Sequence, residues 1–225
     1  MGESIKRIVG PYQDSYSPNG IIGEKDACGV GFIANIKGIE SNWILKQSLK
    51  GLNCMEHRGG CGGDSDSGDG AGILCSIPWK YLDEKMNLKY EKDFNRGLGM
   101  IFMPNKKEKI EKCKSICDQE AEKLKIYNTS WRTVPVNNEI LGPLAKANAP
   151  FISQWILNID KKDNQDIERL LFQLRKRIEK KIRGTFKNHV GDCEFYFASL
   201  SSQTVVYKGM VRSEILAEFY QDLKE

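Results

Sequence analysis

The sequence predicts an α+β domain built of layered helices and sheets, and three observations indicate it. Short apolar segments with the two-residue period of strands alternate with longer segments that have the period of amphipathic helices. The 225 residues are enough to bury one continuous core. The composition, 40% hydrophobic and 28% charged, is that of a globular protein, and no apolar run reaches the roughly 18 residues of a membrane-spanning helix. We therefore expect no membrane partner.

The chain opens with a polar leader, residues 1–27, in which prolines and the pair Asn19-Gly20 interrupt any regular period. The leader lacks the apolar region of a signal peptide, and it contains acidic residues, which transit peptides largely lack. The seven cysteines are odd in number and scattered, which indicates free thiols in a reducing compartment. We expect a cytoplasmic protein, or one of the plastid stroma if its gene lies in a plastid.

The elements after the leader follow from the two periods. Alternating side chains predict a strand over residues 28–36, and Ser41 offers an N-cap for a helix that runs to about residue 55. The later strands are predicted at residues 73–77, 99–103, 131–136, 151–159, 194–199 and 204–207. Helices are predicted at residues 79–86, 106–125, 141–149 and 167–182, and from about residue 213 to the end. The last two strands are expected to form a hairpin.

The charges do not indicate a nucleic-acid partner. The formal net charge is +4, but basic and acidic residues are interspersed along the chain. The densest basic group, Arg175-Lys176-Arg177 with Lys180, Lys181 and Arg183, lies on a predicted amphipathic helix. A solvated helix face explains it better than a phosphate-binding surface.

The glycine-rich segment at residues 56–72 fits none of three common sites. A P-loop needs a lysine where Asp69 stands, and an EF-hand that starts at Asp64 needs a glutamate where Cys75 stands. A dinucleotide fingerprint follows a strand and opens a helix, whereas this segment follows a helix and enters a strand. Two interpretations stay open: the glycines allow close approach of the backbone to another group, or the segment is a flexible surface loop.

We predict no metal site. Cys113 and Cys117 lie four residues apart on a predicted helix, but no second pair stands at zinc spacing. Cys54 and Cys61 likewise lack companions. All four are expected to be ordinary thiols.

Cys28 is the first residue of the predicted strand that follows the leader. It can be a packed core thiol, or it can pair with His57 as a nucleophile. It can also become the first residue once the leader is removed. Its freed α-amino group, with an ordinary pKa of about 7.7–8.0, could then take the proton of the thiol, whose ordinary pKa is about 8.5.

Three segments carry a family resemblance: CGVGFIA at residues 28–34, MEHRGG at 55–60 and DSGDGAGIL at 66–74. They resemble the start of the glutamate synthase large chain, a class II glutamine amidotransferase domain, and most of all its ferredoxin-dependent type. The later segment FASLSSQTVVYKGM, residues 197–210, agrees.

The resemblance implies an N-terminal-nucleophile fold, a four-layer αββα sandwich over residues 28–225, with residues 1–27 cleaved as a propeptide. It implies that Cys28 attacks the amide of L-glutamine, forms a glutamyl thioester and releases ammonia, and that Arg58 supports the placement of Cys28. The complete family enzyme uses the ammonia to make L-glutamate from 2-oxoglutarate, with FMN, an iron–sulfur cluster and ferredoxin.

The chain departs from the family pattern at one point. The family's oxyanion donors include an Asn-Gly pair, but the only such pair here is Asn19-Gly20 in the leader. The substrate-binding residues are expected beyond Glu225, so we expect an incomplete domain that is inactive alone. Two alternatives stay open: another class II amidotransferase, or a non-catalytic α+β module in which Cys28 is a core residue. The choice between ferredoxin and a nicotinamide electron donor also stays open.

Overall fold

The computed structural model describes residues 29–55, 68, 70–89, 93–160, 166–186 and 195–224. The helices are α1 (Asn42–Asn53), α2 (Trp79–Met86), α3 (Lys107–Glu122), α4 (Pro143–Ala147), α5 (Ile167–Thr185) and α6 (Leu216–Phe219). The strands are β1 (Ala71–Ser76), β2 (Phe94–Met103), β3 (Asn128–Thr133), β4 (Phe151–Asp160), β5 (Tyr196–Ser201) and β6 (Thr204–Gly209). Short 3₁₀ helices lie at Asn138–Ile140, Ser213–Ile215 and Gln221–Leu223.

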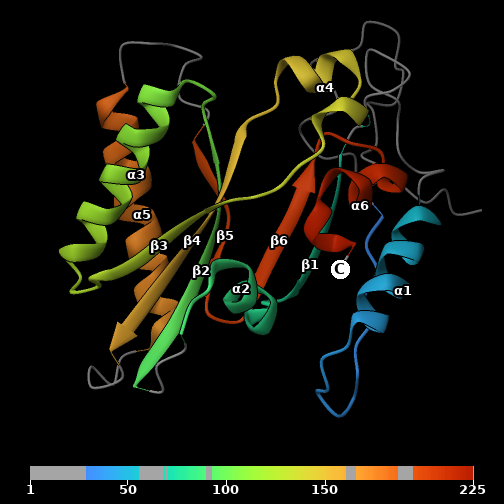
Figure 1. Ribbon diagram of the computed structural model, residues 1–225, viewed down its shortest axis with the longest axis horizontal. Coiled ribbons are helices and arrows are strands. Elements are labelled where there is room, and N and C mark those ends of the chain that lie inside the picture. Colours follow the sequence, from blue (N-terminus) through green and yellow to red (C-terminus); the bar gives the residue numbers. More distant parts are fainter. Residues whose placement is uncertain are drawn as a thin grey trace, which may run out of the picture.

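The strands form two antiparallel sheets. The larger sheet has the order β3-β4-β2-β5, and β1 pairs with β6 in the smaller one. In Figure 1, α3 and α5 cover one face of the larger sheet, the smaller sheet stands on the opposite side, and α1 lies beyond it. The predicted α+β class of layered helices and sheets is therefore confirmed.

Strand β2 explains why the core has two parts. Because successive side chains of a strand point to opposite faces, Met100 and Phe102 enter the cluster that faces β6, while Ile101 and Met103 enter the cluster beneath α3 and α5. All four side chains are buried. A strand covered on both faces needs apolar residues at consecutive positions, and this is what its sequence provides.

Helices α3 and α5 form where the sequence predicts them. On α5, the carboxylate of Asp166 accepts a hydrogen bond from the backbone N–H of Arg169, which caps the first turn. Its predicted apolar stripe is buried at Leu170, Leu171, Leu174, Ile178 and Ile182. The stripe of α3 is likewise buried at Ile110, Cys113, Ile116 and Cys117.

One element near the N-terminus differs from the prediction. Residues 29–36, the described part of the predicted first strand, pair with no strand among the described residues, and Val30, Phe32 and Ile36 are more than 90% exposed. Alternating side chains are compatible with a strand, but a segment becomes part of a sheet only when its backbone forms hydrogen bonds with a neighbouring strand. The helix predicted after this segment is present as α1, with Ser41 at its N-cap as predicted, although the Ser41 side chain makes no capping hydrogen bond.

The predicted hairpin of the last two strands is wrong. Strand β5 pairs with β2, whereas β6 pairs with β1 in the other sheet. The connection between them is held by Glu168, whose carboxylate accepts hydrogen bonds from the hydroxyls of Ser201 and Ser202. The chain passes there from the larger sheet to the smaller one instead of forming a hairpin.

The predicted C-terminal helix is also wrong, because it breaks at Tyr220. The backbone of Tyr220 is extended and forms a β-bridge with Val136, and the N–H of Gln221 donates to the carbonyl of Pro135. These tertiary hydrogen bonds replace those that a continuous helix would make. Three short helical turns result.

Candidate functional site

The two predicted site residues, Cys28 and Arg58, lie outside the described residues. Their described neighbours in the chain are in contact. A Cβ atom placed on Gly29 would lie 3.0 Å from the sulfur of Met55, which follows α1. The chain next to Cys28 therefore touches the chain that leads toward Arg58.

The described end of the glycine-rich segment is packed closely against the rest of the protein. A Cβ atom on Gly68 would lie within 2.7–2.8 Å of backbone atoms of Val211 and Arg212. A Cβ atom on Gly72 would lie 2.8 Å from the Cβ of Lys208. Neither position has room for a side chain. Of the two interpretations left open by the sequence, close backbone approach is confirmed at these residues.

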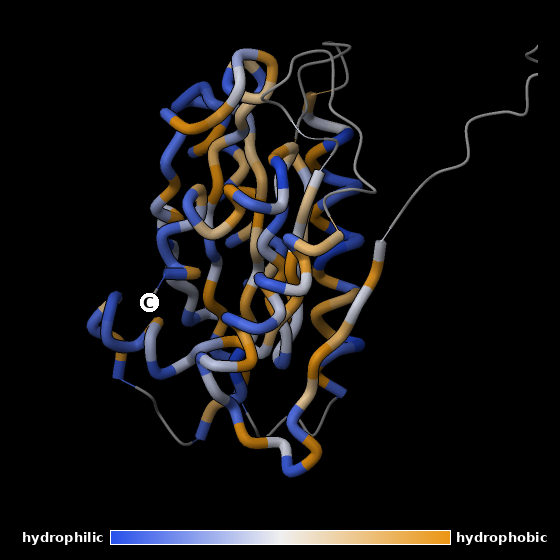
Figure 2. The backbone as a smooth tube through the Cα atoms, turned by 90° about the vertical axis from the view of Figure 1, so that its right-hand side faces the viewer, coloured by the Kyte–Doolittle hydropathy of each residue, from blue (hydrophilic) through white to orange (hydrophobic). Residues whose placement is uncertain are grey.

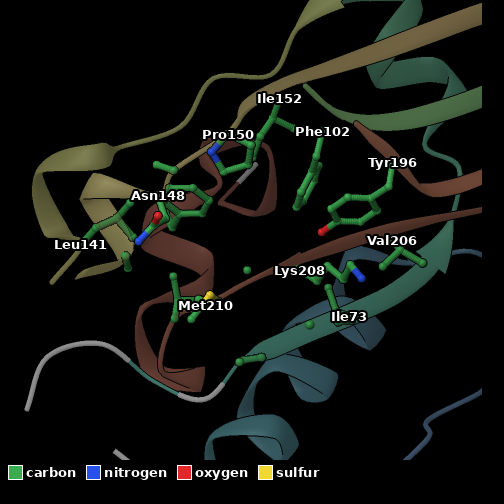
Figure 3. A pocket seen from close by; sticks show the side chains of 18 of the residues that line it. Ile73, Phe102, Leu141, Asn148, Pro150, Ile152, Tyr196, Val206, Lys208 and Met210 are labelled. Atoms are coloured by element: carbon green, nitrogen blue, oxygen red, sulfur yellow. The ribbon is translucent and has the colours of Figure 1, made fainter. Parts of the chain in front are cut away.

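A cavity of about 790 Å³ lies beside Gly70 and Gly72. Its walls come from α4 and the segment after it, from the ends of β2, β4 and β5, and from the smaller sheet with the chain that follows β6 (Figure 3). Most of the lining is apolar, including Leu141, Pro150, Ile152, Phe102, Met210 and Phe219. A cavity of this size is in the usual range for small-molecule sites.

Two polar side chains lie together at the cavity. The Nζ atom of Lys208 lies 4.9 Å from the centre of the Tyr196 ring. Partial burial raises the pKa of Tyr196, so its hydroxyl stays protonated at neutral pH. Figure 3 shows that this hydroxyl points into the cavity. The lining contains no aspartate or glutamate among the residues that the structure describes.

A buried ion pair ties the last turn of the described chain to both sheets. The guanidinium of Arg132 donates to both carboxylate oxygens of Asp222, each at 2.7 Å. The same carboxylate accepts hydrogen bonds from the hydroxyls of Tyr81 at 3.0 Å and Tyr207 at 3.3 Å. Gln154 completes the network: its Oε1 accepts from Arg132 and its Nε2 donates to Tyr207.

Arg132 keeps its positive charge in this network. Burial works to lower the pKa of Arg132, but the hydrogen bonds and the charge of Asp222 outweigh it and raise that pKa. No local pattern could have shown this pairing, because the two residues lie on a strand and in a turn 90 positions later.

The four described cysteines differ in accessibility: Cys54 is exposed, Cys75 is half-buried, and Cys113 and Cys117 are buried. Within the described ranges, no three His, Cys, Asp or Glu side chains come together as a metal site. Iron–sulfur clusters are held by several cysteine thiolates, in some cases with histidines, and the described residues do not bring such a group together.

We expect alkylation by iodoacetamide at pH 8 to be rapid at Cys54 and slow at Cys75. Burial raises the pKa of Cys75 to about 11, so very little of the reactive thiolate is present at that pH. Peptide mass spectrometry of a time course measures both rates. Equal rates in the folded protein would show that burial does not protect Cys75, and unfolding in urea should remove the difference.

In the part of the chain that the structure describes, none of the helices combines the length and the apolar character needed to cross a membrane.

Comparison with known proteins gives one family. The model of the class-II glutamine amidotransferases matches residues 28–225. The chain is 44% identical over 218 residues to a chloroplastic ferredoxin-dependent glutamate synthase of Oryza sativa subsp. japonica, which covers 95% of this chain and 13% of that protein. It is 40% identical over 226 residues to the ferredoxin-dependent glutamate synthase of Pyropia yezoensis, covering 99% of this chain and 14% of that protein.

Ferredoxin-dependent glutamate synthase 2 of a Synechocystis strain is 41% identical over 208 residues, or 91% of this chain. The chain spans only about 13% of the length of these relatives. The layered sheets and helices agree with the N-terminal-nucleophile type of fold that the resemblance implies. The match covers most of the chain, and this protein belongs to the class-II glutamine amidotransferase family.

Proposed function

We propose that this chain is the glutaminase part of a ferredoxin-dependent glutamate synthase. The family match begins at residue 28, the cysteine to which the sequence assigns the chemistry, and this observation carries the proposal. The names of the relatives support the ferredoxin-dependent type over another class II amidotransferase. The Oryza sativa relative is named as a chloroplastic protein, which supports the plastid stroma as the location, with the cytoplasm as the alternative.

In this proposal, residues 1–27 are a leader that is removed, and Cys28 becomes the first residue. Its α-amino group takes the thiol proton, because an amine with a pKa near 7.7–8.0 is partly neutral at physiological pH. While the leader is attached, that nitrogen is an amide without basicity. Removal of the leader would therefore activate the nucleophile.

The Cys28 sulfur then attacks the side-chain amide carbon of L-glutamine. The carbon–nitrogen bond breaks, the amine returns its proton to the departing nitrogen, and ammonia leaves a glutamyl thioester. Water hydrolyses the thioester to L-glutamate and restores the thiol. Arg58 is proposed to support the placement of Cys28. In the complete protein, FMN, an iron–sulfur cluster and ferredoxin would supply electrons for making L-glutamate from 2-oxoglutarate and the ammonia.

The test is labelling of the complete protein by the glutamine analogue diazo-oxo-norleucine. We expect one covalent adduct on the peptide that begins at Cys28, and none in a Cys28→Ala variant. A variant whose leader cannot be removed should react at least tenfold more slowly, since it lacks the free amine.

Intact mass of the natural protein is the accompanying measurement. A first residue at Cys28 supports the proposal. An intact Met1 together with no adduct in a folded protein would contradict it and favour a non-catalytic module.

A further inference from the structure

We propose that the cavity beside β1 and β6 binds a small molecule with an apolar body and a single anionic group, such as an aromatic carboxylate. The proposal goes beyond the glutaminase function, because it concerns a second ligand and does not use Cys28. It is carried by the shape, the lining and the charge of the cavity.

Strands form a large part of the cavity wall. Ile73 on β1 and Val206 on β6 lie on one side, and Phe102 on β2 and Ile152 on β4 lie on the other. The rings of Phe102 and Tyr196 pack with their centres 4.9 Å apart, which fixes both. A site held by strands keeps its shape without a ligand, so little ordering opposes binding.

The apolar lining selects the body of the ligand. The described lining residues are mostly aliphatic and aromatic, and water makes few hydrogen bonds in such surroundings. Displacing that water by a hydrophobic group is favourable in proportion to the apolar area covered. An aromatic ring or a branched chain fits this requirement.

Lys208 favours a ligand that carries a negative charge. It is the one charged residue among the described lining residues, and no hydrogen bond or ion pair of its ammonium is found in the described part of the chain. Its backbone is fixed, because the hydroxyl of Tyr220 donates to the Lys208 carbonyl at 2.7 Å. Gly72 beside it has no side chain that would occupy this space. An anionic oxygen at this place could accept hydrogen bonds from both Lys208 and the Tyr196 hydroxyl.

The same lining disfavours amino acids. A zwitterion brings an ammonium group as well as a carboxylate, and no carboxylate in the described lining could receive it. Burying an unpaired charge is costly. The described lining therefore offers a partner to an anionic group and none to an ammonium group.

Two fluorescent probes test the proposal on this chain: anilinonaphthalene sulfonate, which is anionic, and N-phenylnaphthylamine, which is neutral. We expect each to bind with a stoichiometry of one. Lys208→Met keeps the apolar stem of the side chain and should weaken binding of the anionic probe about tenfold, with little effect on binding of the neutral probe. Lys181→Met makes the same change on the exposed face of α5 and should alter the affinity for neither probe. Ala149→Phe, which fills part of the cavity, should weaken binding of both probes.

A competition assay tests the ligand class. Phenylacetate should displace the anionic probe, and L-phenylalanine at the same concentration should not. Circular dichroism and thermal melting establish that each variant is folded. Unchanged affinity of the anionic probe in folded Lys208→Met, unchanged affinity of both probes in folded Ala149→Phe, or equal displacement by phenylalanine would overturn the proposal. None of these outcomes bears on the labelling of Cys28.

Discussion

Replacing Asp222 with alanine is expected to lower the free energy of unfolding by about 3–5 kcal/mol. The variant leaves the guanidinium of Arg132 without its carboxylate at a place where that side chain is only 11% exposed. The hydroxyls of Tyr81 and Tyr207 lose an acceptor as well. Removal of one partner of a buried ion pair costs far more than the net contribution of the pair, because an uncompensated charge remains.

Urea denaturation followed by circular dichroism measures this loss. The matched control is Glu139→Ala, which breaks the exposed pair of Glu139 with Lys146. Such surface pairs contribute about 0–1 kcal/mol. The double variant Arg132→Met with Asp222→Leu should recover part of the loss, since neither charge remains buried. If Asp222→Ala costs no more than Glu139→Ala, the network does not hold the last turn.

Replacing Trp155 with alanine is expected to destabilise the protein by about 3–5 kcal/mol. The indole is completely buried in the core beneath α3 and α5. It stacks on Trp131 with ring centres 5.3 Å apart, and its Nε1 donates to the carboxylate of Asp118 at 3.1 Å. The variant leaves a large cavity in a close-packed interior, and the structure around a strand can collapse only partly.

The same substitution at Trp43 is the control. That side chain is 64% exposed on α1, so its loss should change stability by no more than about 0.5 kcal/mol. The loss of stability in Trp155→Phe should lie between those of Trp155→Ala and Trp43→Ala, since it keeps an aromatic ring but loses the hydrogen bond. Thermal melts of the three variants give the order of their stabilities. A cost at Trp155 similar to that at Trp43 would mean that the core is not packed as described.

Figure 2 shows why hydropathy alone misplaced the first strand. Val30, Phe32, Ala34 and Ile36 alternate along the chain as on one face of a strand, yet the segment at residues 29–40 runs along the outside of the molecule. Hydropathy reports what a residue would gain from burial. It does not report whether a neighbouring strand is there to bury it.

The sequence by itself determined the elements whose pattern is local. The buried stripes of α3 and α5, the position of α2 and the apolar run of β2 follow from spacing along one element. The motif spacing also indicated the family, and the family match over residues 28–225 confirms that prediction. For the glycine-rich segment at residues 56–72, the sequence left close backbone approach as one of two interpretations and did not show what Gly68 and Gly72 approach.

Only the tertiary structure decided which strands pair, where the C-terminal helix breaks and which polar groups meet. Strand β6 joins β1 across more than 120 residues, Tyr220 leaves its helix to bridge Val136, and Arg132 finds Asp222. The physical reason is the same in each case. These hydrogen bonds and ion pairs join residues far apart in the chain, and their free energy depends on a burial that exists only when the layers are assembled.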